Sequence, residues 1–163
     1  QFKTYRGTLS LDTNDFARSS VEGEIEVASI DTGNADRDAH LRTSDFFDAA
    51  SHPLITFKST SITPKGDSEY VVKGDLSMRG VTKEVALDVE FHGTSKSPYG
   101  HTVAGIGVRG VIHRKDFGVS FNAILESGGV AVAEKVKLEI DVEAIEQLVR
   151  PAPVVAPEAA ATA

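Results

Sequence analysis

The chain has 163 residues, of which 40% are hydrophobic and 25% are charged, and it contains no cysteine. This length and composition predict one globular domain with a sizeable core, and the lack of cysteine excludes disulfides, thiol catalysis and thiolate metal sites. The net charge of −7 and the pI ≈ 5.2 argue against a nucleic-acid surface, which needs a basic stripe, and against electrostatic docking on anionic lipid.

The first part of the chain predicts antiparallel strands and one long insertion. Residues 2–11 alternate as a strand, and residues 21–29 alternate as a second strand whose apolar face includes Ile25 and Val27, opposite three glutamates. A third strand runs from Ile55 to about residue 62. The residues between the second and third strands are too many for a hairpin and too polar for a crossover helix. We therefore interpret residues 31–53 as a lid folded over the end of a sheet.

Within this lid, two segments can each form a short helical turn, namely residues 36–41 and residues 44–50, with Thr43 or Ser44 as the N-cap of the second. Phe46 and Phe47 stand side by side and are expected to be the apolar anchors of the lid. Phe16, which follows the first strand, is expected to tuck against the sheet.

The second part of the chain predicts a meander that continues the same sheet. Residues 70–78 and 85–91 alternate on either side of a turn at 79–80, and residues 93–100 read as a polar loop. Residues 102–114 form a glycine-rich strand in which Arg109 and His113 share one phase, so the other phase faces inward. Residues 136–144 close the sheet, whereas residues 119–130 are ambiguous. These patterns predict an all-β antiparallel barrel over residues 1–145, followed by a Pro/Ala-rich disordered tail over residues 146–163.

Three motifs resemble, in order, those of a known family. They are VEGEIEVASIDTGNADRDAHLRTSDFFDAASHPLITF at residues 21–57, GDLSMRGVTK at residues 74–83 and HRKDFGV at residues 113–119. Together they resemble the YceI-like family of polyisoprenoid-binding proteins. The resemblance implies an antiparallel, lipocalin-like eight-stranded barrel with a short helical lid, of which about seven strands are visible here. The family's N-terminal strand has no counterpart in this sequence, so we expect the natural protein to be longer.

The resemblance also implies a function, which is non-catalytic binding or transport of a long-chain polyisoprenoid lipid, either a polyprenyl phosphate or an isoprenoid quinone. Inward apolar side chains would line the lipid: Ile25, Val27, Phe57, Val72, Leu76, Leu87, Val89, Phe91, Ile106, Val108 and Ile112. Arg37, Arg114 and Lys115 are the cations available for an anionic headgroup. Composition alone explains the same alternation by a packed core. A barrel-fold interaction or stress-response module therefore stays open as an alternative.

The sequence predicts neither a catalytic site nor a metal site. One polar group of lid residues matches no established metal-ligand spacing: Asp36, Asp38, His40 and His52. Arg37, Asp38 and His40 are expected instead to pin the lid by charge-assisted hydrogen bonds. A second group lacks the Gly-x-Ser-x-Gly elbow of a hydrolase: Ser29, Ser59, His113 and Asp116.

An enzyme acting on a prenyl lipid is thus a further alternative without a nominated acid-base pair, and no cofactor other than the isoprenoid is expected. No apolar run approaches the ~20 residues of a membrane-spanning helix, so no transmembrane segment is predicted. The sequence favours neither the cytoplasm nor a periplasmic or secreted location, and it leaves a homodimer open.

Overall fold

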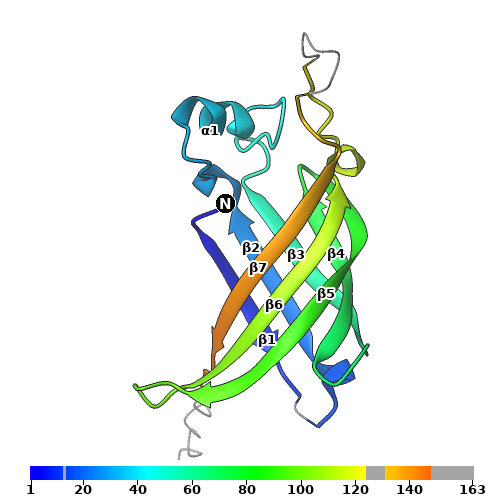
Figure 1. Cartoon of the computed structure of the whole chain (residues 1–163). Coiled ribbons are helices and arrows are strands. Elements are labelled where there is room, and N and C mark those ends of the chain that lie inside the picture. The colour runs from blue at the N-terminus through cyan, green and yellow to red at the C-terminus, as the bar shows by residue number, and fades with distance from the viewer. Residues whose placement is uncertain (13, 124–130, 148–163) are drawn as a thin grey trace, which may run out of the picture.

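The computed structural model describes residues 1–12, 14–123 and 131–147, and most of these residues form one curled antiparallel sheet (Figure 1). Its strands are β1 (Tyr5–Ser10), β2 (Ser20–Glu26), β3 (Leu54–Pro64), β4 (Glu69–Met78), β5 (Val81–Lys96), β6 (Thr102–His113) and β7 (Lys135–Ile145). Each strand pairs with the next one in the chain, so the strand order in the sheet is β1-β2-β3-β4-β5-β6-β7. The meander predicted from apolar alternation is therefore confirmed.

The sheet curls into a half-barrel, which confirms the lipocalin-like antiparallel architecture (Figure 1). Within the described residues, β1 pairs only with β2 and β7 pairs only with β6, so both are edge strands. Irregularities in pairing at Ser59/Ser61 in β3 and at Phe91/Gly93 in β5 are of the kind that bends a strand and increases its twist. They help a sheet of seven strands to curl.

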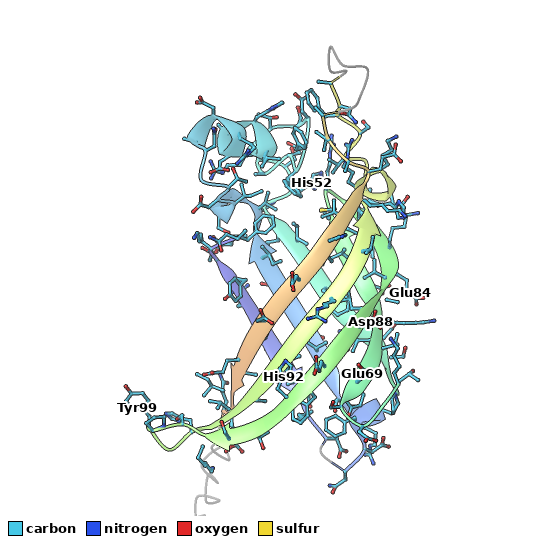
Figure 2. All side chains as sticks on the ribbon, viewed as in Figure 1. His52, Glu69, Glu84, Asp88, His92 and Tyr99 are labelled. Atoms are coloured by element: carbon cyan, nitrogen blue, oxygen red, sulfur yellow. The ribbon has the colours of Figure 1, made fainter. Side chains whose placement is uncertain are left out.

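Strand β5 is longer than the sequence predicts, because residues 93–96 belong to the strand and not to a loop. The irregularity between Phe91 and Gly93 absorbs one residue, and pairing with β6 then resumes from Gly93 to Lys96. Gly93 adopts a φ of 93°, which favours glycine. The predicted polar loop is thus confined to residues 97–101, and Tyr99 at its tip projects into solvent (Figure 2).

The predicted lid lies at the end of the half-barrel where the N-terminus also lies (Figure 1). It contains α1 (Ala35–Arg42), which begins after Asn34, whose side chain accepts a hydrogen bond from the Arg37 backbone N–H. Residues 44–47 form a hydrogen-bonded turn, in which the Phe46 backbone N–H donates to the Thr43 carbonyl at 3.1 Å, so the second predicted segment makes a single turn and no regular helix. Thr43 instead ends α1, with its backbone N–H donating to the His40 carbonyl.

Val27 lies outside the strand in which the sequence places it. It begins the 3-10 helix η2 (Val27–Ser29), and its backbone N–H donates to the Pro53 carbonyl at 2.9 Å. This hydrogen bond joins the two ends of the lid insertion. The Val27 side chain is nevertheless among the most buried in the described protein, so its apolar role survives the correction.

Apolar side chains fill both ends of the half-barrel. At the lid end the buried core consists of Val27, Ile55, Leu76, Met78, Ile112 and Phe117. At the opposite end the 3-10 helix η1 (Phe16–Arg18) places Phe16 against Tyr70 and Phe91, with ring centroids 5.0 Å and 5.4 Å away. The expectation that Phe16 tucks against the sheet is confirmed.

The segment after β6 forms a last 3-10 helix, η3 (Arg114–Phe117), which ends at Gly118 with a φ of 73°. Part of the ambiguous stretch and most of the predicted tail, residues 124–130 and 148–163, lie outside the described residues, so the predicted domain boundary stays a prediction. No helix in the described part of the chain is long and apolar enough to cross a membrane.

Candidate functional site

The concave face of the half-barrel collects the apolar residues that the sequence assigns to a ligand. Directly paired residues of neighbouring strands share a face of a sheet, and the register joins Val72 to Leu87 and Val89 to Val108. The same register joins Phe57 to Leu76 and Phe91 to Ile106. Ile25 pairs with the buried Ile55, and Ile112 is itself buried. All the predicted ligand residues except Val27 therefore lie on strands and on this one face.

Access to the concave face increases from the centre of the sheet toward β7. Val72 and Leu76 on β4 are buried, Val108 on β6 is half-buried, and the row continues on β7, where Val136, Ile140 and Val142 are 38%, 41% and 38% exposed. Val136, Ile140 and Val142 pair with Ile112, Val108 and Ile106. The predicted ligand residues of β6 thus belong to an apolar wall that reaches the edge of the sheet.

Glycines on this face make room for the protein's own side chains. A Cβ atom at Gly74 would overlap the Phe57 ring, and one at Gly110 would overlap the Leu87 side chain. On the convex face, a Cβ at Gly105 or Gly107 would come within 3.3 Å or 3.1 Å of the His92 side chain. The groups that a Cβ atom would meet at these four positions come from the chain itself.

The Arg114 side chain has a structural role, because it binds backbone carbonyls. Its side chain is almost fully buried, and its guanidinium donates hydrogen bonds to the carbonyls of Val119 at 2.8 Å, Phe121 at 2.7 Å and Ala133 at 2.9 Å. A fourth, longer bond reaches the Val132 carbonyl at 3.3 Å. These contacts hold together the segment between η3 and β7. With its donors directed at backbone, Arg114 is a poor candidate for a headgroup contact.

The two other cations predicted for a headgroup lie at the surface and also have partners. The Lys115 ammonium pairs with the Glu134 carboxylate. This hydrogen bond and the charge of Lys115 lower the pKa of Glu134. The Arg37 guanidinium donates to the Thr32 hydroxyl at 2.8 Å and to the Thr32 carbonyl at 2.9 Å. Arg37 thus binds a lid residue, and Lys115 binds the residue that precedes β7.

Polar lid residues hold the lid in shape, as predicted. The buried Asp38 carboxylate accepts hydrogen bonds from the Thr32 backbone N–H at 2.9 Å and from the Thr32 hydroxyl at 2.5 Å. His40 lies 2.9 Å from the Asp45 carboxylate and contacts the rings of Phe46 and Phe121 edge-on. Phe46 is buried and Phe47 is half-buried, which matches their predicted role as anchors.

The side chains considered for catalysis or metal binding serve other contacts. The Ser29 hydroxyl donates to the Glu26 carbonyl at 2.6 Å, and the Ser59 hydroxyl accepts from the Val21 backbone N–H at 2.9 Å. His52 lies against Gly80 in the β4–β5 turn, at the lid end (Figure 2). Among the described residues, no three histidine or acidic side chains form a group that could hold a metal ion.

Sequence reasoning missed Arg79, which fastens the lid to the sheet. Arg79 occupies the β4–β5 turn with a φ of 53°, a conformation that non-glycine residues rarely adopt. From there its guanidinium donates to the Ser44 carbonyl of the lid at 2.6 Å and to the Gly118 carbonyl at the end of η3 at 2.7 Å. No sequence pattern points to this role, because an arginine in a turn is usually exposed to solvent.

Replacing Arg79 with glycine should loosen the lid without unfolding the sheet, because glycine keeps the turn conformation and removes only the guanidinium. We expect hydrogen exchange to become about tenfold faster or more in residues 43–52 and 114–119, which corresponds to the ~1.5–3 kcal/mol of a charge-assisted hydrogen bond. Arg79→Lys, which retains a charged donor, should give a smaller effect. Unchanged exchange in both segments would show that Arg79 does not fasten the lid.

Two surface hollows have volumes of ≈ 110 Å³ and ≈ 100 Å³, and most of the residues that line them are polar or charged. The larger one includes Asp88, Glu90, His92, Arg109 and Asp141. His92, Asp88 and Glu69 lie over the half of the sheet that is far from the lid (Figure 2). Because these side chains alternate with the inward rows of β5, β6 and β7, the larger hollow belongs to the convex face. Neither hollow has the character of an apolar lipid site.

Comparisons with known proteins agree on one relationship. Residues 1–144 match the family described as the YceI-like domain. A UPF0312 protein of Staphylococcus aureus is 42% identical over 143 residues, which cover 87% of this chain and 81% of that protein. A UPF0312 protein of Staphylococcus epidermidis is 41% identical over the same shares.

Solved structures give the same result. The YCEI protein of Campylobacter jejuni superposes with a TM-score of 0.79 at 30% identity, covering 91% of this chain and 84% of that one. BcnA of Burkholderia cenocepacia superposes with a TM-score of 0.76 at 26% identity, covering 88% and 85% of the two chains.

Proposed function

Because the chain belongs to the YceI-like domain family, we propose that it binds or transports a long-chain polyisoprenoid lipid and catalyses no reaction. The lipid chain would lie on the concave face of the half-barrel, against Val89, Ile106 and Val108 and the neighbouring residues of β7. The observation that supports this placement is the continuous apolar wall of β6 and β7, which becomes more accessible toward β7.

The energetics of an isoprenoid favour such a wall. Each buried methylene contributes about 0.8 kcal/mol, so a long prenyl chain gains much from a dry surface and needs no catalytic group to stay bound. Within the described residues, every buried side-chain nitrogen or oxygen has a hydrogen-bond partner. The described interior therefore has no buried side-chain polar atom that lacks a hydrogen-bond partner and could bind a polar ligand. This supports an apolar ligand.

A second candidate is an interaction module with a packed core. The packing at two glycines favours this second candidate. The Phe57 ring fills the space beside Gly74, and the Leu87 side chain fills the space beside Gly110. These contacts fill the centre of the sheet, so any lipid chain would have to lie nearer to β7. The two candidates thus differ in whether the wall formed by Val108, Ile140 and Val142 is covered by a ligand.

Native mass spectrometry of the protein purified from its own source, followed by solvent extraction, separates the two candidates. A co-purifying isoprenoid that leaves on extraction is the expected result. A protein that is reproducibly empty, and that takes up no added polyprenol, would favour the packed module. Chemical conversion of an added prenyl lipid would instead indicate an enzyme.

A further inference from the structure

Strand β7 has one open edge in the described part of the chain. It pairs with β6 on one side (Figure 1), and all of its residues except Leu138 and Ala144 are exposed. An open edge presents a row of unpaired backbone N–H and C=O groups, and such a row can pair with a strand of another chain. The side chains along the edge decide which strand can do so.

Alternate residues of β7 direct their backbone groups away from β6. At the two ends of the pairing, the Arg114 N–H donates to the Glu134 carbonyl at 3.1 Å, and the Glu146 N–H donates to the Thr102 carbonyl at 2.8 Å. The register between these two bonds has no break, so the even-numbered residues of β7 bond to β6. The odd-numbered residues therefore direct their N–H and C=O groups outward: Lys135, Lys137, Glu139, Asp141, Glu143 and Ile145.

The charges of this outward row are sorted along the strand. Lys135 and Lys137 lie in its first half, and Glu139 and Asp141 follow in its second half. Among the described residues, Glu139 reaches Arg109 at 4.0 Å, and the other three form no ion pair at 4.0 Å or less. A strand with a positive first half and a negative second half complements a copy of itself that runs in the opposite direction. In a parallel pairing, like charges would meet.

One register of the antiparallel pairing opposes unlike charges at every position. A two-fold axis perpendicular to the sheet keeps the convex residues of both copies on one face, so the residue on the axis determines all pairs. With Leu138 on the axis, Lys135 faces Asp141 of the second copy, and Lys137 faces its Glu139. A shift of the axis by one or two residues in either direction brings two lysines or two carboxylates together.

The same register matches the apolar row on the concave face. Leu138 meets its own copy and Ile140 meets Val136 of the second copy, at the non-hydrogen-bonded positions where side chains of opposite strands come closest. Val136 and Ile140 are 38% and 41% exposed, so the pairing removes apolar surface from water. Lysines on an edge strand often discourage pairing with other chains, but here each lysine finds a carboxylate.

The other edge of the sheet lacks such a pattern. Strand β1 has six residues, and its convex row contains Arg6, Thr8 and Ser10. The single charge of this row is already paired with the Glu24 carboxylate of β2. Gly7 adds no side chain that could pack across an interface. Strand β1 therefore offers no charge pattern that selects a copy of itself.

We propose that two copies of this chain associate through β7, antiparallel and about a two-fold axis at Leu138, to form one continuous sheet. The proposal does not rest on lipid binding, because it uses the edge of the sheet and leaves the concave face open to a ligand. Residues 135–141 of each copy form a small interface, so we expect a dissociation constant in the micromolar range. Salt should weaken the dimer, because the charge pairs are exposed.

Sedimentation of the full chain from about 1 μM to about 1 mM brackets the affinity expected of a small interface, and hydrogen exchange over the same range reports on the edge. We expect a monomer that converts to a dimer, with slower exchange of the outward Lys137 and Glu139 amides at high concentration. A monomer at every concentration would overturn the proposal. Protection of these two amides in the monomer would also overturn it, because another segment would then cover the edge.

Charge reversal tests the pairing itself. Lys137→Glu and Glu139→Lys each oppose like charges at two symmetric positions, so each variant alone should dimerise at least tenfold more weakly. An equal mixture of the two variants opposes unlike charges at every position again, and it should associate within about threefold of the unchanged protein. A mixture that stays monomeric, although both variants keep their melting temperatures, would overturn the proposal.

Glu143→Lys is the matched control on the same row. With Leu138 on the axis, Glu143 faces Ala133 of the second copy, so this reversal should leave the dissociation constant within about twofold. With Glu139 on the axis, Glu143 would instead face Lys135, and its reversal would weaken the dimer as strongly as the other two. A loss of tenfold or more in Glu143→Lys would therefore overturn the assigned register.

Discussion

Replacing Arg114 with alanine is expected to lower the free energy of unfolding by about 3–5 kcal/mol. Arg114 is 3% exposed, and its guanidinium donates to the four carbonyls of Val119, Phe121, Val132 and Ala133. Its loss leaves the buried Val119 carbonyl without this donor and removes the charge-assisted hydrogen bonds that join the four carbonyls to η3. For a domain of this size the melting temperature should fall by about 10 °C or more.

Thermal and denaturant unfolding of three variants would check this result. Arg114→Lys keeps the positive charge but presents fewer, differently directed donors, so an intermediate loss is expected. Lys115→Ala is the matched control, because it removes a neighbouring cation whose ion pair with Glu134 is exposed and contributes at most about 1 kcal/mol. A loss below about 1 kcal/mol for Arg114→Ala would contradict the structural role of this arginine.

Val108→Trp should abolish isoprenoid binding while the protein remains folded. Val108 is half-buried in the middle of β6, between Val89 on β5 and Ile140 on β7. Ile140 is itself accessible, so an indole has room to lie along the wall where the lipid chain is proposed to lie. We expect at least a hundredfold loss of affinity for a polyprenol and a change in melting temperature of only a few degrees.

Val111→Trp is the matched control on the same strand. Val111 belongs to the opposite, convex face and is 53% exposed, so its replacement should affect neither binding nor stability. Unfolding of Val108→Trp alone would point to a packed core, because overpacking a full interior costs roughly 1–3 kcal/mol or more. A folded variant that still binds the polyprenol with full affinity would show that the lipid does not lie against β6.

The strands could be predicted from the sequence because apolar alternation has the same period as the pleat of a sheet. The same signal placed Val108 and Ile112 on the inward face. It failed at Val27, because alternation continues past the end of β2 into η2 without a break in the pattern. It also ended β5 too early, because Gly93 reads as a loop residue although it continues the strand after an irregularity.

The charged residues were harder to assign. Arg114 and Lys115 are adjacent cations in the sequence, yet one is buried against carbonyls and the other is exposed in an ion pair. Nothing in a local pattern separates them, because the carbonyls that bind Arg114 lie up to 19 residues away. Arg79 was missed for the same reason, since its two acceptors lie 35 and 39 residues away.

The strand order β1-β2-β3-β4-β5-β6-β7 has a consequence for how the chain acquires its structure. Every pairing joins neighbours along the chain, so most loops that must close during folding are short hairpins, and closing a short loop costs little entropy. Such a topology has a low contact order for an all-β protein and should fold faster than a Greek-key sandwich of equal length. The exceptions are the pairings of β2 with β3 and of β6 with β7, which must wait for residues 27–53 and residues 114–134 to close. Hydrogen-exchange labelling during refolding should therefore protect β4, β5 and β6 before β1 and β2.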